Sequence, residues 1–354
     1  MHVRHNRHGG LTLIGMPGFE NMTGKVREKI ESVGSKPDKE NTLVDVVVPS
    51  FGERLSGEPF LRLGKDHIGG HDVVIITSGP GTYKMLGQLN LLLRYLVGRR
   101  AERIAVVSGY LPLARSDKDE GVLEFALPPL IIDQMMNAAE GRLDRIIAAD
   151  LHSPQVVMAG GTGLVTEVSM VRRLLHRTIE DARNHNGKTC LALPDDGAAK
   201  RIEGAFKDVE ARLQCILPIV FGAKRRRSSG ESALKQLFGD LDCLPDSTVI
   251  LLDDELASGG TNINTAELLK RDYGAAEVWT AVTHGIFCGD AVKRLMHDSC
   301  PVDRIYVTDT IPTDNRSQLG PLIRSGKLVV VSWCEDLAWI IYHHHWDLSI
   351  REMR

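Results

Sequence analysis

The sequence has no apolar run of the roughly 18 residues that a membrane-spanning helix requires. Its opening segment, MHVRHNRHGG, also lacks the apolar stretch of a secretion signal. The six cysteines among the 354 residues include no Cys-x-x-Cys pair and no spacing typical of zinc sites. A formal net charge of -3 provides no general attraction to nucleic acid or anionic lipid. We therefore expect a cytoplasmic protein with reduced cysteines and neither a membrane nor a nucleic-acid partner.

The length exceeds that of a typical single core and favours two domains. The composition, 43% hydrophobic and 25% charged, is that of a globular chain rather than a disordered one. A glycine-rich segment, Ala159–Gly163, precedes a restart of the strand and helix pattern. The sequence thus predicts an N-terminal domain of residues 1–160 and a C-terminal domain of residues 161–354.

Short runs rich in valine and isoleucine alternate with segments of helical periodicity along the chain. The runs are continuously apolar, which is typical of strands covered on both faces by helices. The expected strands are Asp45–Phe51, Asp72–Ser78, Arg103–Tyr110, Arg145–His152, Thr189–Asp195, Cys215–Phe221, Thr248–Asp254, Glu277–His284, Arg304–Thr308 and Leu328–Trp333. The expected helices are Tyr83–Val97, Pro129–Ala139, Ser169–Asn184, Ala198–Ala211 and Asn262–Lys270. This alternation predicts an α/β fold with mostly parallel sheets.

Several expected strands end in polar residues just before a loop. Asp150 and His152 close one strand, Asp195 another, and Asp253 and Asp254 a third. Ligands of open α/β sheets bind beyond the carboxyl ends of the strands. We therefore expect the chemistry of this protein at that edge of each sheet.

Segment 249–261, VILLDDELASGGT, is the strongest motif of the chain. An apolar run leads into Asp253 and Asp254 and then into a Ser-Gly-Gly-Thr turn before a helix. Glycines let the backbone wrap closely around an anion, and the first N–H groups of a helix point at it. Two hydroxyls add donors, while the carboxylates suit sugar hydroxyls or a magnesium ion shared with the sugar. The candidate sugar-phosphate residues are Asp253, Asp254, Ser258, Gly259, Gly260 and Thr261. An ordinary strand–turn–helix with an acidic end is the alternative interpretation.

Motifs in order along nearly the whole chain resemble the ribose-phosphate diphosphokinase family. They are segment 249–261, Tyr110–Asp119 (YLPLARSDKD), Asp150–Gln155 (DLHSPQ), Pro194–Arg201 (PDDGAAKR), Thr283–Ala291 (THGIFCGDA), Val307–Pro312 (VTDTIP) and Lys327–Met353. Plain phosphoribosyltransferases share the first of these but lack the N-terminal half. The resemblance implies two tandem type I phosphoribosyltransferase-like domains, with the ATP side in the first and the ribose 5-phosphate side in the second. It leaves open whether the last helix packs on the first domain.

The resemblance also implies roles for individual residues. Arg115 and Asp117 fall in the ATP-site segment, and Glu58 ends a partly recovered adenine-contacting segment. His152 and Asp195 would hold Mg²⁺. The implied reaction transfers the diphosphoryl group of ATP to O1 of ribose 5-phosphate, which releases AMP and forms phosphoribosyl diphosphate. The family further implies a homo-oligomer built from dimers, commonly a hexamer.

The basic run Lys224–Arg227 follows directly on the expected strand Cys215–Phe221. A solvated surface run is the plain interpretation of four successive cations. A mobile cationic loop at the active edge can instead stabilise the negative charge that develops as a diphosphoryl group transfers. The resembling family uses a Lys-Arg-Arg loop in this way, which implies that Lys224 and Arg226 are the catalytic residues.

Three departures from the family pattern leave alternatives open. The sugar loop has Ala257 where the family has an acid, Ser116 replaces a glutamine, and a few extra residues precede Glu58. A weakly catalytic paralogue that regulates the active enzyme is one alternative. A transferase for another sugar phosphate or acceptor is the other.

The run His343–His345 lies inside the last helical pattern, between Tyr342 and Trp346. The native-like sequence on both sides favours an ordinary helix over a metal cluster. We expect these histidines on the surface of that helix, without a metal.

Overall fold

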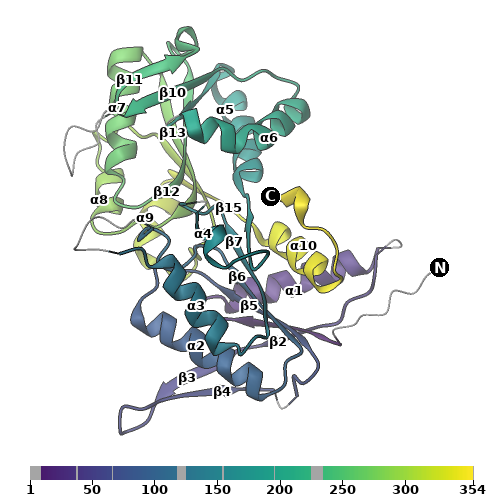
Figure 1. Ribbon diagram of the computed structural model, residues 1–354. Helices are drawn as coiled ribbons and strands as arrows, with labels where there is room; N and C mark the ends of the chain where they lie inside the picture. The colour runs from purple at the N-terminus through teal and green to yellow at the C-terminus, as the bar shows by residue number, and fades with distance from the viewer. Residues whose placement is uncertain are drawn as a thin grey trace. The chain divides into compact units, whose positions relative to one another are not determined.

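The computed structural model describes residues 9–36, 39–65, 67–117, 125–153, 155–194, 196–224 and 234–353 (Figure 1). The chain divides by its internal contacts into two compact units. One comprises Met1–Ser169 with Trp333–Arg354, and the other comprises Met170–Ser332. In the described part of the chain, no helix is both long and apolar enough to cross a bilayer.

The first unit is built on a six-stranded parallel sheet in the order β2-β1-β5-β6-β7-β8. The strands are β1 (Leu11–Gly15), β2 (Val44–Val47), β5 (Asp72–Thr77), β6 (Arg103–Ser108), β7 (Leu143–Ala149) and β8 (Val165–Val168). The helices are α1 (Glu20–Gly34), α2 (Tyr83–Gly98), α3 (Pro128–Ala138), α4 (Val156–Ala159) and α10 (Cys334–His345), with a 3₁₀ turn, η3 (Arg351–Met353). Every residue of β1 and β5 is buried, as expected for central strands with both faces covered.

A two-stranded hairpin, β3 (Pro49–Glu53) and β4 (Pro59–Leu63), forms a separate small sheet in this unit (Figure 1). The expected strand Asp45–Phe51 is thus two strands. Pro49 lacks the N–H that would continue the ladder of β2, so the chain changes partner there. The extra residues before Glu58 form the hairpin turn, in which Arg54 N–H donates to Glu58 O at 2.8 Å and Gly57 N–H donates to Arg54 O at 2.9 Å.

The second unit contains a seven-stranded sheet in the order β11-β10-β9-β12-β13-β14-β15. All its pairings are parallel except that of β10 with β11. The strands are β9 (Thr189–Leu193), β10 (Ile219–Lys224), β11 (Leu234–Gly239), β12 (Thr248–Leu256), β13 (Glu277–Gly285), β14 (Arg304–Thr308) and β15 (Leu328–Val331). The helices are α5 (Val171–Asn186), α6 (Asp196–Leu213), α7 (Gly260–Tyr273), α8 (Ala291–Leu295) and α9 (Gly320–Arg324), with 3₁₀ turns η1 (Leu241–Cys243) and η2 (Ser317–Leu319).

One strand order is used twice. The equivalent pairs are β2 and β10, β1 and β9, β5 and β12, β6 and β13, β7 and β14, and β8 and β15. The expected α/β architecture of two tandem, mostly parallel sheets is therefore confirmed. The boundary between the two units falls after Ser169 rather than after residue 160, because β8 pairs with β7 and completes the first sheet.

The last helix, α10, packs against α1 in the first unit. Lys29 of α1 donates to Glu335 at 3.0 Å, and Trp346 Nε1 donates to Thr42 Oγ1 at 2.7 Å. The expectation that the histidine run lies on the helix surface is wrong for His344 and His345, which are 4% and 2% exposed, whereas His343 is only partly buried.

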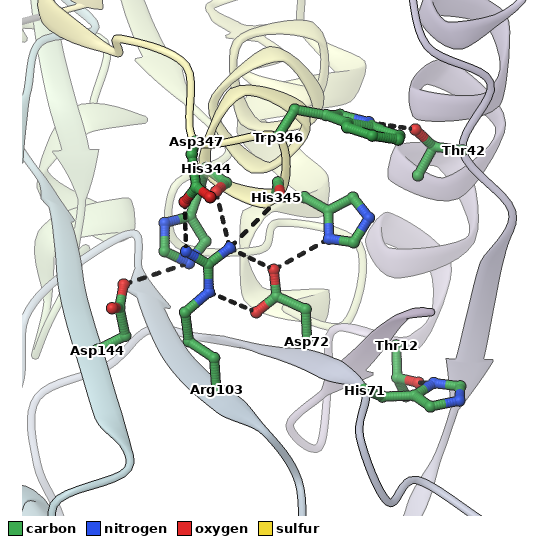
Figure 2. Close-up of polar contacts among 10 residues, drawn as sticks. All are labelled: Thr12, Thr42, His71, Asp72, Arg103, Asp144, His344, His345, Trp346 and Asp347. Atoms are coloured by element: carbon green, nitrogen blue, oxygen red, sulfur yellow. Dashed lines mark hydrogen bonds and ion pairs between the residues drawn. The ribbon is translucent and has the colours of Figure 1, made fainter. Parts of the chain in front are cut away.

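These histidines belong to a buried polar network at the amino ends of β5 and β6 (Figure 2). The Arg103 guanidinium makes two bonds to Asp72, from Nε at 3.0 Å and from Nη2 at 2.6 Å. It also donates to His344 O at 2.9 Å and to Asp347 Oδ1 at 2.8 Å. His345 Nδ1 lies 3.0 Å from Asp72 Oδ2. The network fastens the end of α10 to the sheet, at the edge opposite the carboxyl ends of the strands.

The expectation that the cysteines are reduced is wrong for one pair. Cys190 of β9 and Cys243 of η1 are joined by a disulfide, so they are not both reduced in this structure. The other four, Cys215, Cys288, Cys300 and Cys334, form no disulfide.

Candidate functional site

The sugar-phosphate motif lies at the carboxyl end of β12 in the second unit. The strand continues to Leu256, so Asp253 and Asp254 lie within it and are half-buried. Pairing with β13 persists to the end of β12, where Glu255 is opposite His284. Asp253 Oδ1 accepts the N–H of Asp254 at 3.0 Å. The paired strand therefore fixes the backbone of both carboxylates at the edge where ligands bind.

The turn after β12 has the geometry of an anion-binding helix start. Gly259 caps α7 with φ 76°, a left-handed conformation that favours glycine. The 14-residue helix α7 begins at Gly260, and Thr261 in its first turn is exposed. Ser258 is exposed as well, so hydroxyls and free helix N–H groups open to solvent together. This arrangement can accept a phosphate group.

Arg294 of α8 is a cation at this turn that the sequence motif did not indicate. A Cβ placed on Gly260 would lie 3.8 Å from Arg294 Nη1 and 3.7 Å from Ser258 Oγ. A guanidinium beside the positive end of a helix dipole is unfavourable unless an anion lies between them. No local pattern around Ala291–Leu295 marks this role, because only the fold brings α8 to the turn.

The candidate ATP-side residues follow strands of the first unit. Arg115 is exposed and Asp117 half-exposed in the segment after β6, and His152 follows β7. Because β6 and β7 are parallel neighbours, these segments leave the same edge of the sheet. Glu58 lies apart from them in sequence, in the turn of the β3–β4 hairpin, where its Oε2 accepts from Ser56 Oγ at 2.8 Å.

The turn after β7 is conformationally unusual. Asp150 has φ 32°, which is uncommon for a residue other than glycine. Its shape is held by Asp150 N–H donating to Val168 O at 2.9 Å and by Leu151 N–H donating to Glu167 Oε1 at 2.8 Å. The turn sets the position from which His152 leaves the sheet.

Two expected site residues, Asp195 and Arg226, lie outside the described residues. Lys224 is the last residue of β10, and its backbone pairs with Leu234 of β11. The structure describes the backbone of Lys224 but not its side chain. The expected strand before the basic run is shifted along the chain, because β10 extends to Lys224 and is lengthened by antiparallel pairing with β11.

Among the described residues, no group of three or more His, Cys, Asp and Glu side chains could hold a metal ion. Magnesium usually keeps several waters and is held by one or two protein groups together with substrate phosphates. That mode needs no complete protein cage, and His152, beside the Asp150 turn, would contribute one group to it.

Comparisons with known proteins identify the family and the fold. The model of the phosphoribosyl synthetase-associated domain matches residues 236–340. A ribose-phosphate pyrophosphokinase of Bradyrhizobium diazoefficiens is 30% identical over 286 residues, covering 80% of this chain and 83% of the relative. That of Rhizobium meliloti is 32% identical over 273 residues, covering 75% and 80%. The crystal structure of phosphoribosylpyrophosphate synthetase from Mycobacterium smegmatis has a TM-score of 0.73 at 24% identity, and the match covers 96% of this chain and 99% of that one.

The fold and the structural match first define a class, that of α/β proteins with two tandem, mostly parallel sheets flanked by helices. Within this class, the chain belongs to the ribose-phosphate pyrophosphokinase (diphosphokinase) family. The family predicted from the sequence motifs is thereby confirmed, and with it the assignment as an enzyme.

Proposed function

We propose that the protein transfers the diphosphoryl group of ATP to ribose 5-phosphate in the presence of Mg²⁺. Oxygen 1 of the sugar attacks the β-phosphorus, and the bond from that phosphorus to the oxygen bridging the α-phosphate breaks. AMP leaves with the bridging oxygen, the proton of the sugar hydroxyl is released, and phosphoribosyl diphosphate is formed.

The turn between β12 and α7 is the observation that supports this proposal most directly. Ser258, Gly259, Gly260 and Thr261 would hold the 5-phosphate with free helix N–H groups and hydroxyls. Arg294 would meet the same phosphate from α8. Asp253 and Asp254, just before the turn, would orient the ribose hydroxyls.

The diphosphoryl group would be met by the cations that begin at the end of β10. Lys224 and Arg226 would stabilise charge on the transferring group, because fixed cations act most strongly where charge develops. Glu58, Arg115 and Asp117 would contact ATP.

Magnesium would be held at His152 and Asp195 together with the phosphates of ATP. When bound, the ion neutralises phosphate charge and makes the β-phosphorus easier to attack. The imidazole and carboxylate would orient the nucleotide through the ion. A homo-oligomer built from dimers, which the family resemblance of the sequence implies, is also part of the proposal.

Replacement of Gly260 by alanine is expected to weaken ribose 5-phosphate binding by about tenfold or more. The added methyl would enter the space bounded by Ser258 Oγ and Arg294 Nη1 at ordinary contact distance, so the fold would tolerate it while the phosphate would not. Gly204→Ala in α6, where a Cβ meets no atom within 4 Å, is the control. Calorimetric titration measures the affinity of both variants for ribose 5-phosphate. Equal affinity in Gly260→Ala and the control would contradict the placement of the phosphate.

Transfer of ³²P from ATP labelled at the β-phosphorus tests the reaction itself. We expect the label in the sugar product, with unlabelled AMP as the other product. Label retained in ADP would show an ordinary kinase and would exclude the proposed reaction.

The regulatory alternative has specific support in two residues. Ala257 in the sugar loop and Ser116 beside Arg115 each remove a polar group that the family pattern has there. A regulatory paralogue would bind an active synthetase and raise or lower its activity without releasing AMP alone.

A further inference from the structure

The loop after β13 forms a second wall of the sugar-phosphate turn. Ile286 N–H and Phe287 N–H both donate to Leu256 O, at 2.9 and 3.0 Å, and Cys288 N–H donates to Ala257 O at 3.0 Å. Three backbone bonds thus tie this loop, residues 285–288, to the start of the turn that opens α7. A change in the conformation of the loop would move the turn with it.

The loop is held in a conformation that its sequence does not favour. Phe287 has φ 50°, a left-handed value that is rare for a bulky residue, and it is 3% exposed. Its ring folds back over Gly285, where a Cβ would lie 2.6 Å from the ring. Such backbone strain persists only where surrounding contacts impose it, and it is concentrated at functional sites.

Arg316, from the segment after β14, supplies these contacts. Its Nη1 donates to Gly285 O at 2.6 Å and its Nη2 donates to Ile286 O. The guanidinium carbon lies 5.7 Å from the centre of the Phe287 ring. The planar fork of arginine suits two successive carbonyls and an aromatic face, which lysine cannot match.

The environment of Arg316 is unusual for a structural arginine. It is half-buried, burial lowers its pKa, and it has no ion-pair partner among the residues that the structure describes. Its backbone is itself fixed, since Arg316 N–H donates to Thr313 O and Leu319 N–H donates to Arg316 O. A half-buried cation without a counter-ion is retained at a cost in desolvation, which its hold on the strained loop would offset.

We propose that Arg316 is a positioning residue for the sugar-phosphate site. It fixes loop 285–288, and the loop fixes Leu256 and Ala257 at the start of the phosphate-binding turn. The consequence for ribose 5-phosphate rests on the proposed function, whereas the mechanical link between Arg316 and the turn does not. Arg316 touches no substrate in this account and acts only through the loop.

Hydrogen exchange measured on the full chain without substrate tests the link independently of activity. In Arg316→Ala, amide exchange is expected to rise at least about tenfold in peptides covering residues 256–261 and 285–288. Peptides from β9 and from residues 248–253 of β12 should be unchanged. Arg324→Ala, which removes an exposed arginine of α9, is the matched control and should leave every peptide unchanged. Unchanged exchange at residues 256–261 in Arg316→Ala, or a rise spread over the whole second unit, would overturn the proposal.

Calorimetric binding of ribose 5-phosphate and of ATP then separates positioning from simple loss of structure. Arg316→Ala is expected to weaken the binding of ribose 5-phosphate about tenfold or more and to leave the affinity for ATP unchanged. Arg316→Lys should be intermediate, and added guanidinium ion should partly restore Arg316→Ala. Equal loss for both ligands would refute a positioning role. If the wild-type protein releases no AMP, the proposed reaction fails, but the exchange result still decides the role of Arg316.

Discussion

Replacement of Lys224 by alanine is expected to lower the turnover number by roughly three orders of magnitude or more. The KM values for ATP and ribose 5-phosphate should change little. A cation that meets the diphosphoryl group as charge develops stabilises the transition state more than the bound substrates, so its loss appears in the chemical step. The strand geometry supports this role, because β10 ends at Lys224, at the carboxyl edge of the sheet.

Lys207→Ala is the control for the loss of a positive charge in the same unit. Lys207 lies on α6 in an exposed ion pair with Glu203 and has no part in the proposed site. Steady-state and single-turnover rates of the two variants give the comparison. If Lys224→Ala loses no more activity than Lys207→Ala, the basic run is a surface feature and the catalytic cations lie elsewhere.

Replacement of Arg103 by alanine is expected to destabilise the first unit by about 3–5 kcal/mol. The variant leaves the carboxylate of Asp72, which is 0% exposed, without its bidentate partner (Figure 2). It also removes the donors to His344 O and Asp347 that hold the end of α10. Urea denaturation followed by circular dichroism measures the change. Lys29→Ala, which breaks an exposed pair between α1 and α10, is the control and should have little effect.

The same network sets a dependence of stability on pH. Burial alone raises the pKa of Asp72, but hydrogen bonds from His345 and Arg103 outweigh it and lower the pKa from 3.8 to about 2. The contribution of Asp72 to stability is therefore present above about pH 4 and is lost as the pH falls toward 2. Burial lowers the pKa of His344 from 6.5 to about 4. Between these pH values the unfolded chain binds a proton at His344 more readily than the folded chain, so the free energy of unfolding decreases as the pH falls from 6.5 to 4.

Arg103→Ala should accordingly unfold in acid at a higher pH than the wild-type protein. Without the guanidinium, burial dominates and Asp72 takes up a proton more readily. Acid titration monitored by tryptophan fluorescence measures the two midpoints. Coincident midpoints, together with an unchanged urea midpoint at neutral pH, would show that the network contributes nothing to stability.

Much of the fold could be predicted from the sequence because its central strands are continuously apolar. β5, β6, β12 and β13 are buried on both faces, so their sequences carry the signal directly. β8 and β11 lack such a signal. Val165–Val168 has a glutamate and Leu234–Gly239 a lysine and a glutamine, and each becomes a strand through pairing with its neighbour. Burial of His344 and His345 could not be predicted either, because their partners are distant in the sequence: Asp72 contacts His345, and Arg103 donates to the carbonyl of His344.

The candidate site likewise has one part that could be predicted from the sequence and another that could not. Segment 249–261 is contiguous, so its strand, turn and helix start could be identified from residue order alone. Arg294 reaches this turn, and Arg316 reaches the loop that supports it, only after the chain has passed through further strands and helices. Their neighbours in sequence are not distinctive, and the strained backbone of Phe287 leaves no mark in the sequence. The structure adds the cation beside the turn and the loop that supports it.

The account is tested most directly by AMP release from the purified protein supplied with ATP, Mg²⁺ and ribose 5-phosphate, with each omitted in turn. The account predicts AMP formation that requires all three, in equal amount to phosphoribosyl diphosphate. A well-folded protein that binds ribose 5-phosphate but releases no AMP under any of these conditions would contradict it and would favour the regulatory alternative.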